Sequence, residues 1–475
     1  MRGRTALASI LVFASSCTAD TGAVPGADDR PASPMESPAL ATPTLNVSWP
    51  DPPDVPDGPL DPSVSEAVDR LIATILPRSL DRDALQVVAA SDDARLAWFI
   101  SDFLRFLQGG TEEEALVEAF TDLTGVNPSG DDRFGRVAWL AVTNLLIAWD
   151  LPAPPDYRER KAALYLAVEP GWEPFFADPD SVIDWRLVSW GGVFIDDRPA
   201  GDRSPCARGC IPALDDPALT PAADGDWYAD HRIVFGVVVG DEAVAFPKHI
   251  MEVHEMVNIT IGGRRIGMPY CTLCGSPQAY LTDAVPEGVE TPVLRTSGLL
   301  SRSNKVMYDL VTGSVFDTFI GRAISGPLED IGFVLEQTSV VVSTWGEWRA
   351  AHPDTMIVAQ DGGIGRTYLD DPLGGRDDAG PIFPIGEADP RLPKQTRVLG
   401  VIDPDGQPVA FPVEQATAAL TSGREVSLGV VEVVADGGGL RAKLRGGEEI
   451  PAHEAFWFAW SQFHPETLVW TPLDR

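Results

Sequence analysis

The sequence has no apolar run that reaches the roughly 18 residues a membrane-spanning helix needs. Basic residues are also scarce, because 36 lysines and arginines stand against 70 acidic residues and give a formal net charge of -34. Such an excess of negative charge repels phosphate backbones, so nucleic acid is not an expected partner. The sequence also lacks a glycine-rich phosphate loop, a Gly-x-Ser-x-Gly elbow and a His-Glu-x-x-His zinc motif.

The apolar residues that are present make up 44% of the chain, which is ample for folded cores. The length of 475 residues favours two to four folded units.

The first residues have the parts of an export signal. Met1 to Arg4 carries two arginines and no acid, residues 5–14 are mainly small and apolar, and two serines then lead into Cys17. This order is typical of a secretory signal. It also resembles the bacterial lipobox, in which the cysteine is lipidated, although Ala14 stands where that motif usually has leucine. Cleavage without lipid is the alternative.

Residues 18–62 contain eleven prolines, eight acids and one base, Arg30. A segment of this composition does not bury enough apolar surface to offset its ordering entropy, so we interpret it as a disordered tether. With residues 1–17 as the signal, the mature chain is expected at the outer face of a bacterial membrane, in the periplasm or on the cell surface. The membrane is then a partner through the lipid on Cys17.

Residues 63–165 have a helical pattern. One apolar stripe recurs at steps of three and four residues, at Leu96, Phe99, Ile100, Phe103, Leu104 and Leu107. No catalytic cluster falls in this region, so we predict a helical domain that supports the rest of the chain or contacts a partner. Beyond Trp172, short β-branched runs, glycines and prolines predominate. The predicted fold class is therefore α+β.

An internal repeat divides the β-rich part. Gly236-Val237 followed by Ala243 to Pro247 returns as Gly400-Val401 followed by Pro408 to Pro412. Trp345-x-x-Trp348-x-x-x-His352-Pro353 returns as Trp457-x-x-Trp460-x-x-x-His464-Pro465. We therefore predict two related β-rich lobes, residues 166–395 and 396–475, of which only the first contains cysteines. A histidine retained in both lobes, such as His352, indicates a structural role.

The first lobe holds the one concentrated chemical motif. His254 precedes a predicted hairpin about Gly262-Gly263, and Cys271-x-x-Cys274 follows that hairpin. The helical pattern around His254 turns its side chain toward the protein body. The hairpin returns the chain to its starting side, so His254, Cys271 and Cys274 are expected to meet.

Three readings of this motif are open. The favoured one is a metal site, because two thiolates and an imidazole suit copper or zinc and leave one ligand position free. The second is a redox dithiol, in which His254 lowers the pKa of one cysteine. The third is a structural disulfide, with His254 as a core residue.

Further residues are candidates for the lining of the site, and they are His249, Glu255, Asn258, Tyr270, Ser276, Arg302 and Asn304. Arg302 and Asn304 have two interpretations. Either they line the mouth of the site and bind an anionic group, or they belong to a polar turn before the next strand. The remaining cysteines, Cys206 and Cys210, lie in a loop rich in Asp, Pro and Gly. In an oxidising compartment this spacing favours a local disulfide.

A resemblance to a known family is carried by these motifs and by others downstream. The matching residues are Ala245-Phe246-Pro247, His254-Glu255-x-Val257-Asn258, Gly262-Gly263, Tyr270-Cys271-x-x-Cys274-Gly275-Ser276, Ser297-Gly298-Leu299-Leu300, Met307-Tyr308-Asp309, Thr312-Gly313-Ser314 and Trp345-x-x-Trp348-x-x-x-His352-Pro353-Asp354-Thr355. They resemble the bacterial family called domain of unknown function 3179, closely over residues 185–358. Thr272 departs from the proline usual at that place. The resemblance implies no activity.

The sequence thus predicts an extracytoplasmic lipoprotein that binds copper or zinc. A thiol–disulfide oxidoreductase is the first alternative. The second is a surface scaffold with a structural disulfide, whose tryptophan-rich lobes hold a partner or a glycan.

Mass spectrometry of protein extracted from membranes tests the anchoring. We expect the mature chain to begin at a lipidated Cys17, because each buried CH₂ of a lipid chain contributes about 0.8 kcal/mol to membrane binding. The variant Cys17→Ser is expected to lose membrane association, whereas Ser16→Ala keeps a small residue and retains it. An unmodified start at Thr18 or later contradicts the prediction.

Overall fold

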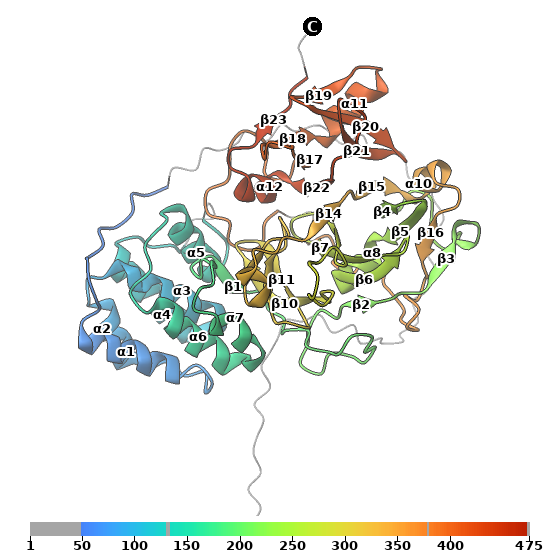
Figure 1. Cartoon of the computed structure of the whole chain (residues 1–475). Coiled ribbons are helices and arrows are strands. Elements are labelled where there is room, and N and C mark those ends of the chain that lie inside the picture. The colour runs from blue at the N-terminus through green and yellow to red at the C-terminus, as the bar shows by residue number, and fades with distance from the viewer. Residues whose placement is uncertain (1–48, 130–133, 378–379, 473–475) are drawn as a thin grey trace, which may run out of the picture.

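The computed structural model describes residues 49–129, 134–377 and 380–472 (Figure 1). It is an α+β structure in which N-terminal helices precede a β-rich part, as the sequence predicted. The predicted signal, Cys17 and residues 18–48 of the predicted tether lie outside the described residues. Among the described residues, no helix combines the length and the apolar character needed to cross a membrane.

The helical part packs around a single large apolar core. Its helices are α1 (Pro62–Ala73), α2 (Arg82–Ala89), α3 (Ala97–Phe106), α4 (Gly110–Thr124), α5 (Ala138–Ala148), α6 (Tyr157–Val168) and α7 (Glu173–Ala177). The predicted apolar stripe of α3 is buried along its whole length, from Leu96 to Leu107. Burial of a stripe at steps of three and four explains why this segment is helical and which face it turns inward.

The last residues of the predicted tether lie against this helical core. Residues 49–61 contain no helix or strand. The indole Nε1 of Trp149 donates a hydrogen bond to the Pro50 carbonyl at 2.7 Å. A guanidinium nitrogen of Arg95 donates to the Gly58 carbonyl at 3.0 Å. This end of the segment is therefore fixed to the helices.

Over its described residues, the β-rich part contains five sheets. The first contains β1 (Val188–Trp190), β10 (Leu294–Ser301), β11 (Asn304–Asp309), β12 (Val315–Asp317) and β13 (Ala323–Ser325). The second contains β14 (Glu336–Thr338), β9 (Ala279–Leu281), β7 (Arg264–Cys271), β6 (Met256–Ile261) and β2 (Leu214–Asp215), with β8 (Ser276–Pro277) paired to β7. The third contains β15 (Val341–Thr344), β4 (Ile233–Val239), β5 (Glu242–Pro247), β16 (Met356–Val358) and β3 (Leu219–Pro221).

The fourth sheet contains β22 (Ala452–Phe456), β17 (Arg397–Ile402), β18 (Pro408–Pro412) and β23 (Leu468–Val469). The fifth contains β19 (Val426–Leu428), β20 (Val431–Asp436) and β21 (Gly439–Leu444). The helices of this part are α8 (Lys248–His254), α9 (Pro327–Asp330), α10 (Trp345–Ala351), α11 (Val413–Thr421) and α12 (Trp457–Phe463). The sheets are arranged as a propeller-like ring, and the division into two related lobes stays a prediction.

Four strands of the third sheet, β15-β4-β5-β16, have the same order and directions as β22-β17-β18-β23 of the fourth, and β3 is an additional edge strand of the third sheet. In each, a hairpin (β4–β5 or β17–β18) pairs antiparallel with one further strand and parallel with another. The indole of Trp348 donates to Thr355 Oγ1 at 3.0 Å, and that of Trp460 donates to Thr467 Oγ1 at 2.9 Å. Each indole covers a glycine of the neighbouring strand, Gly236 or Gly400.

Adding a methyl group at either glycine tests this packing. A Cβ on Gly400 overlaps the ring of Trp460, which is 1% exposed and has no space to move. We expect Gly400→Ala to lower the free energy of unfolding by about 3 kcal/mol, measured by chemical denaturation. Gly446→Ala is the matched control, since no atom lies within 4 Å of its Cβ position. Equal stability of the two variants contradicts the packing described.

Candidate functional site

The two cysteines of the Cys-x-x-Cys motif lie side by side at the end of β7. The predicted hairpin about Gly262-Gly263 is formed by β6 and β7, and Cys271 is the last residue of β7. Gly275, in a left-handed conformation with φ of 59°, reverses the chain so that β8 pairs back onto β7. Cys271 and Cys274 are free thiols, exposed by 3% and 0%, with their sulfurs 2.9 Å apart. This distance exceeds the about 2.05 Å of a disulfide bond.

His254 does not join the thiols, and the structure corrects the expected three-residue cluster. Its Nδ1 lies 2.7 Å from the Pro212 carbonyl oxygen and its Nε2 lies 2.7 Å from the Tyr368 hydroxyl. Both ring nitrogens therefore have partners other than a metal ion or sulfur. The physical reason is that the inward face of α8 meets residues 212 and 368, which are remote in sequence, before it meets the cysteines.

The protonation state of His254 follows from these contacts. A carbonyl oxygen only accepts hydrogen bonds, so Nδ1 carries a proton. Burial lowers the pKa of His254 to about 4, so the ring is neutral at neutral pH and Nε2 accepts from the Tyr368 hydroxyl. A neutral imidazole does not stabilise a thiolate as a cation does.

Lys305 supplies the positive charge beside the thiols. Its Nζ donates to the backbone carbonyls of Glu255 at 2.6 Å and Tyr270 at 3.2 Å, and lies 3.0 Å from the Glu255 carboxylate. Glu255 in turn accepts a hydrogen bond at 3.0 Å from the hydroxyl of Thr272, the residue after Cys271. The ammonium group is therefore held next to the cysteine turn.

The two thiols have different acidities. Burial and the charge of the Glu255 carboxylate raise the pKa of Cys271, whereas the hydrogen bond with Cys274, the backbone N–H of Lys305 and the charge of Lys305 lower it. The resulting pKa is below the usual range of a thiol. Burial, together with the neighbouring Cys271, raises the pKa of Cys274 well above that range. Cys271 is consequently the first of the two to become a thiolate, the reactive form of a cysteine.

Cys271 lines a cavity of about 1000 Å³ between the helical part and the first two sheets. Glu255, Thr272 and Lys305 line it as well, whereas Cys274 is fully buried behind the wall. The apolar part of the lining includes Phe106, Trp190, Phe194 and Phe383. The more acidic thiol is thus the one in contact with the cavity.

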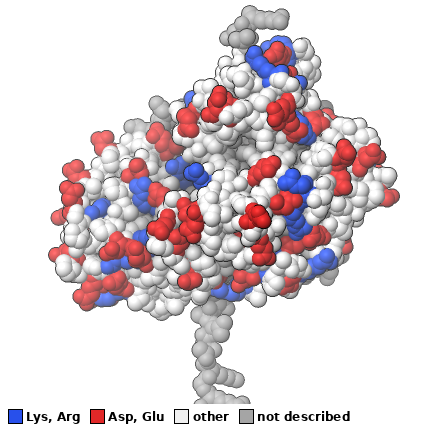
Figure 2. Space-filling model, viewed as in Figure 1, with Lys and Arg blue, Asp and Glu red and all other residues white. Residues whose placement is uncertain are grey.

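The remaining charged groups of the cavity are one acidic residue, Glu252, and four basic ones, Arg78, Arg105, Arg366 and Arg376. Glu252 is paired with Lys248 at 2.5 Å. Within the described residues these guanidinium groups contact backbone carbonyls and aromatic rings but no carboxylate. Burial lowers the pKa of Arg105 to about 10, so this group stays charged at neutral pH. The outer surface differs, because acidic side chains are spread over the face seen in Figure 2, with smaller groups of Lys and Arg among them.

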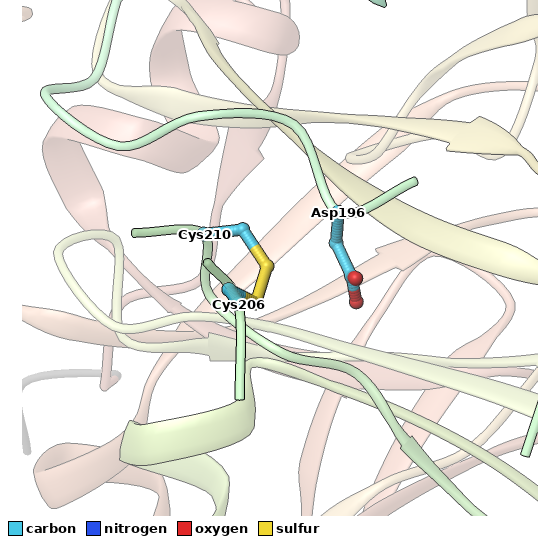
Figure 3. A group of neighbouring side chains, drawn as sticks. All are labelled: Asp196, Cys206 and Cys210. Atoms are coloured by element: carbon cyan, nitrogen blue, oxygen red, sulfur yellow. A yellow bond between two sulfur atoms is a disulfide. The ribbon is translucent and has the colours of Figure 1, made fainter. Parts of the chain in front are cut away.

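Cys206 and Cys210 form a disulfide, as the sequence predicted (Figure 3). Among the described residues, Asp196, Cys206 and Cys210 are the one group of three potential metal ligands whose ligand atoms lie close together. Two sulfurs joined to each other have no thiolate to offer an ion. The Asp196 carboxylate is also occupied, since it accepts from Arg198 at 2.6 Å and from the Ala213 amide at 2.7 Å.

The other residues predicted to line the site have structural contacts. The His249 ring stacks on that of Tyr228 at 5.3 Å, and the Asn258 amide links Asp215 to the Leu294 carbonyl. The side chains of Tyr270, Ser276 and Asn304 are buried, and the hydroxyl of Ser276 and amide oxygen of Asn304 have no hydrogen-bond partner among the described residues.

The prediction that Arg302 lies at the mouth of the cysteine site is wrong. Arg302 lines a separate cavity of about 10 Å³ and donates a hydrogen bond to the Gln462 carbonyl. Arg302 lies in the turn between β10 and β11, with a left-handed φ of 53°. Glu255 alone of the predicted lining residues faces the large cavity. Sequence reasoning missed Lys305 and Arg105, since neither belongs to a motif and only folding brings them to the cysteines.

The protein has an α+β fold with N-terminal helices and a buried dithiol beside a cavity lined mainly by basic groups. Residues 208–445 match the family described as "Protein of unknown function (DUF3179)", and the match covers half of the chain. The chain belongs to this family, as its motifs suggested. No curated protein and no solved structure matches the chain.

Replacing Lys305 tests its effect on Cys271. Removal of the ammonium group in Lys305→Met takes away an attraction for the thiolate, so the pKa of Cys271 is expected to rise. The pH midpoint of alkylation of Cys271, followed by mass spectrometry, is then expected to move to higher pH. Lys305→Arg keeps the charge and is the control. Identical midpoints for the wild type and Lys305→Met contradict the assignment.

Proposed function

We propose that Cys271 and Cys274 carry out thiol–disulfide exchange with a substrate that binds in the cavity. The observation that carries the proposal is the 2.9 Å separation of two free thiols, one of them on the cavity wall. A small rotation of the side chains closes this gap to the length of a disulfide bond. The lowered pKa of Cys271 supports the proposal, because the thiolate is the attacking species.

Cys271 is the attacking residue in this proposal and Cys274 is the resolving residue. The Cys271 thiolate attacks one sulfur of a substrate disulfide and forms a mixed disulfide, and the other substrate sulfur leaves as a thiolate. Cys274 then attacks Cys271 Sγ, which forms the Cys271–Cys274 bond and releases the second substrate sulfur. The proton of Cys274 and one proton from water end on the substrate sulfurs. Two electrons pass from the protein to the substrate.

The cavity favours a substrate that has both negative charge and apolar surface. Arg105 has no carboxylate partner in the part of the chain that the structure describes, and its guanidinium lies 4.4 Å from the ring centre of Trp139 and 5.2 Å from that of Trp190. A buried cation without a counter-ion favours the binding of an anion. We infer that the substrate is a disulfide that carries carboxylates next to apolar groups.

Metal binding by the same cysteines is the competing function. With His254 bound to Pro212 and Tyr368, the motif offers two sulfur ligands, fewer than the three or four protein ligands of zinc sites. Exchange chemistry requires only the two sulfurs. The copper and zinc content of protein purified from the export compartment distinguishes these functions.

We also propose that the protein is exported and anchored by lipid outside the cytoplasm. The pattern of residues 1–17 supports this location. The Cys206–Cys210 disulfide supports it too, because disulfides persist in oxidising compartments. A reduced Cys271–Cys274 pair in such a compartment requires a source of electrons.

We further propose that the third and fourth sheets are copies of one duplicated unit. Equal strand order, equal strand directions and the paired Trp–Thr hydrogen bonds support this origin. The copy with the fourth sheet has no cysteine, so its role is to support the site. Phe456 does so directly, since its backbone N–H donates to the Cys274 carbonyl at 2.8 Å.

An aromatic disulfide with two carboxylates, dithiobis(nitrobenzoate), tests the exchange. We expect the wild-type protein to release two thiols per chain and to end with a Cys271–Cys274 disulfide. Cys274→Ser is expected to release one thiol and to retain a mixed disulfide on Cys271, because the resolving step is lost. Absorbance of the released thiol and the mass of the intact protein measure both results.

Cys271→Ser is the matched control, and it is expected to react far more slowly, since Cys274 is fully buried and its pKa is raised. A wild-type protein that ends with probe attached to both cysteines contradicts exchange. So does a protein whose thiols remain unreacted while it binds copper or zinc.

A further inference from the structure

The first sheet forms one wall of the cavity of about 1000 Å³. Three neighbouring strands contribute to this wall, with Trp190 from β1, Leu299 and Leu300 from β10, and Lys305 and Val306 from β11. Arg105 contacts the β1 side of the wall, and Cys271 contacts the β11 side. The guanidinium and the thiol that line the cavity therefore lie at opposite sides of one sheet.

Arg105 is fixed at the β1 side by contacts that leave most of its donors free. It lies in the last turn of α3, and its Nε donates to the Trp190 carbonyl at 2.5 Å. The ring centres of Trp139 and Phe383 lie 4.4 Å and 5.7 Å from its Cζ. The terminal nitrogens, which carry the other N–H donors of a guanidinium, have no hydrogen-bond partner within the described residues.

Gly192 leaves one of these terminal nitrogens uncovered. It lines the cavity just after β1, with a left-handed φ of 95°. Among the described atoms, Arg105 Nη2 is the one that lies within 4 Å of the Cβ position of Gly192, at 3.1 Å. A side chain at residue 192 stands directly against Nη2, so the glycine keeps this nitrogen open to the cavity.

Arg105 differs from the other arginines of the cavity in its exposure. Arg78, Arg366 and Arg376 are exposed, whereas Arg105 is half-buried. Solvent and salt screen an exposed guanidinium, so a carboxylate gains little by binding to one. Arg105 is therefore the arginine of this cavity that binds an anion most strongly.

The acidic residues that line the cavity have cations of their own. Glu252 lies 2.5 Å from Lys248, and Glu255 lies 3.0 Å from Lys305. Neither carboxylate contacts Arg105. The charge of Arg105 is consequently left for a ligand.

The register of the first sheet sets the separation between its two sides. Ser189 of β1 pairs with Leu300 of β10, and Leu300 pairs with Lys305 of β11. Neighbouring strands lie about 4.8 Å apart, so Ser189 and Lys305 are separated by about 10 Å. Trp190, whose carbonyl holds Arg105, is the next residue after Ser189.

The Cys271 sulfur lies at the other side of this span. It accepts a hydrogen bond from the backbone N–H of Lys305 and lies 3.8 Å from the Ser303 carbonyl, in the turn before β11. The Arg105 guanidinium and the Cys271 sulfur are therefore on the order of 10 Å apart along the wall.

We propose that Arg105 determines the specificity of the exchange by binding a carboxylate of the substrate disulfide, about 10 Å from the sulfur that Cys271 attacks. The inference rests on the proposed exchange function and adds the residue that selects the substrate and the length of substrate that fits. A guanidinium and a carboxylate form two parallel hydrogen bonds, which fixes the orientation of the substrate as well as its charge.

This length identifies a class of substrate. An extended peptide spans about 3.3 Å per residue, so about 10 Å corresponds to about three residues. The class that fits is a short peptide disulfide in which the cysteine is followed by about two residues and then by a free C-terminal carboxylate.

Peptide disulfides of graded length test this distance on the wild-type protein. Each is the disulfide of acetyl-cysteine followed by zero to five glycines, with either a carboxylate or an amide at the C-terminus. Reduced protein is mixed with excess peptide, and formation of the Cys271–Cys274 disulfide is followed by alkylation and mass spectrometry. The measurement gives a saturating rate constant and a half-saturating concentration for each peptide.

We expect the half-saturating concentration of the carboxylate peptides to be lowest at about two glycines. Amidation at that length is expected to raise it about 10-fold, because a charge-assisted pair of hydrogen bonds is lost. The amide peptides are expected to show no preferred length. The saturating rate constant is expected to change little, since Arg105 does not touch the reacting sulfurs.

Variants of Arg105 provide a second measurement. Arg105→Met fills the space between the aromatic rings without a charge, and it is expected to remove the difference between carboxylate and amide peptides. Arg105→Lys keeps the charge but not the paired donors, so an intermediate difference is expected. Arg82→Gln is the matched control, because Arg82 is an exposed arginine of the same helical part that does not line the cavity. A purely structural role of Arg105 changes the reaction of both peptides equally.

Equal half-saturating concentrations for carboxylate and amide peptides at every length overturn the role of Arg105 and leave the exchange function intact. A preference for carboxylate that persists in Arg105→Met overturns it as well, since another cation then binds the substrate. So does a protein that reacts with dithiobis(nitrobenzoate) but with none of the peptides. Thiols that react with neither kind of disulfide overturn the exchange function itself.

Discussion

The geometry of the dithiol depends on Glu255, the residue that follows α8. Its backbone is left-handed, with φ of 50°, a conformation that costs a non-glycine residue about 1–2 kcal/mol. Hydrogen bonds offset this cost. The Glu255 carbonyl accepts from Lys305 at 2.6 Å and from the Tyr270 amide at 2.9 Å, while its carboxylate contacts Lys305 and Thr272. The end of α8, the end of β7 and the start of β11 are thus fixed to one residue.

This arrangement explains why Lys305, and not His254, is the buried cation. A buried charge is stable only where it is paired and hydrogen-bonded. Lys305 has two carbonyls and a carboxylate around its ammonium group, so its charge is both paired and hydrogen-bonded. His254 faces a carbonyl and a hydroxyl, and burial therefore leaves it neutral. The positive charge that the sequence analysis assigned to the imidazole of His254 is supplied by the ammonium group of Lys305.

The features that the sequence predicted correctly and those that it missed differ in how far apart the contacting residues lie in the chain. Local signals were sufficient for the helix stripe of α3, for the β6–β7 hairpin and for the adjacent cysteines, because each depends on residues close in the chain. The partners of His254 could not be predicted, since Pro212 and Tyr368 are 42 and 114 residues away. The periodicity of a short helix indicates that a side chain faces inward, but not which distant segment it meets. Lys305 and Arg105 were missed for the same reason.

The cavity and the outer surface have opposite charge preferences, and this contrast restricts what the site can bind. A net charge of -34 repels anions at long range, although salt screens the repulsion beyond a Debye length of about 10 Å. Inside the cavity, guanidinium groups that contact no carboxylate of the described ranges attract anions over short distances, where screening is weak. A polyanion such as nucleic acid meets mainly the repulsion. A small anionic disulfide that enters the cavity meets mainly the attraction, and it arrives next to the thiol that ionises first.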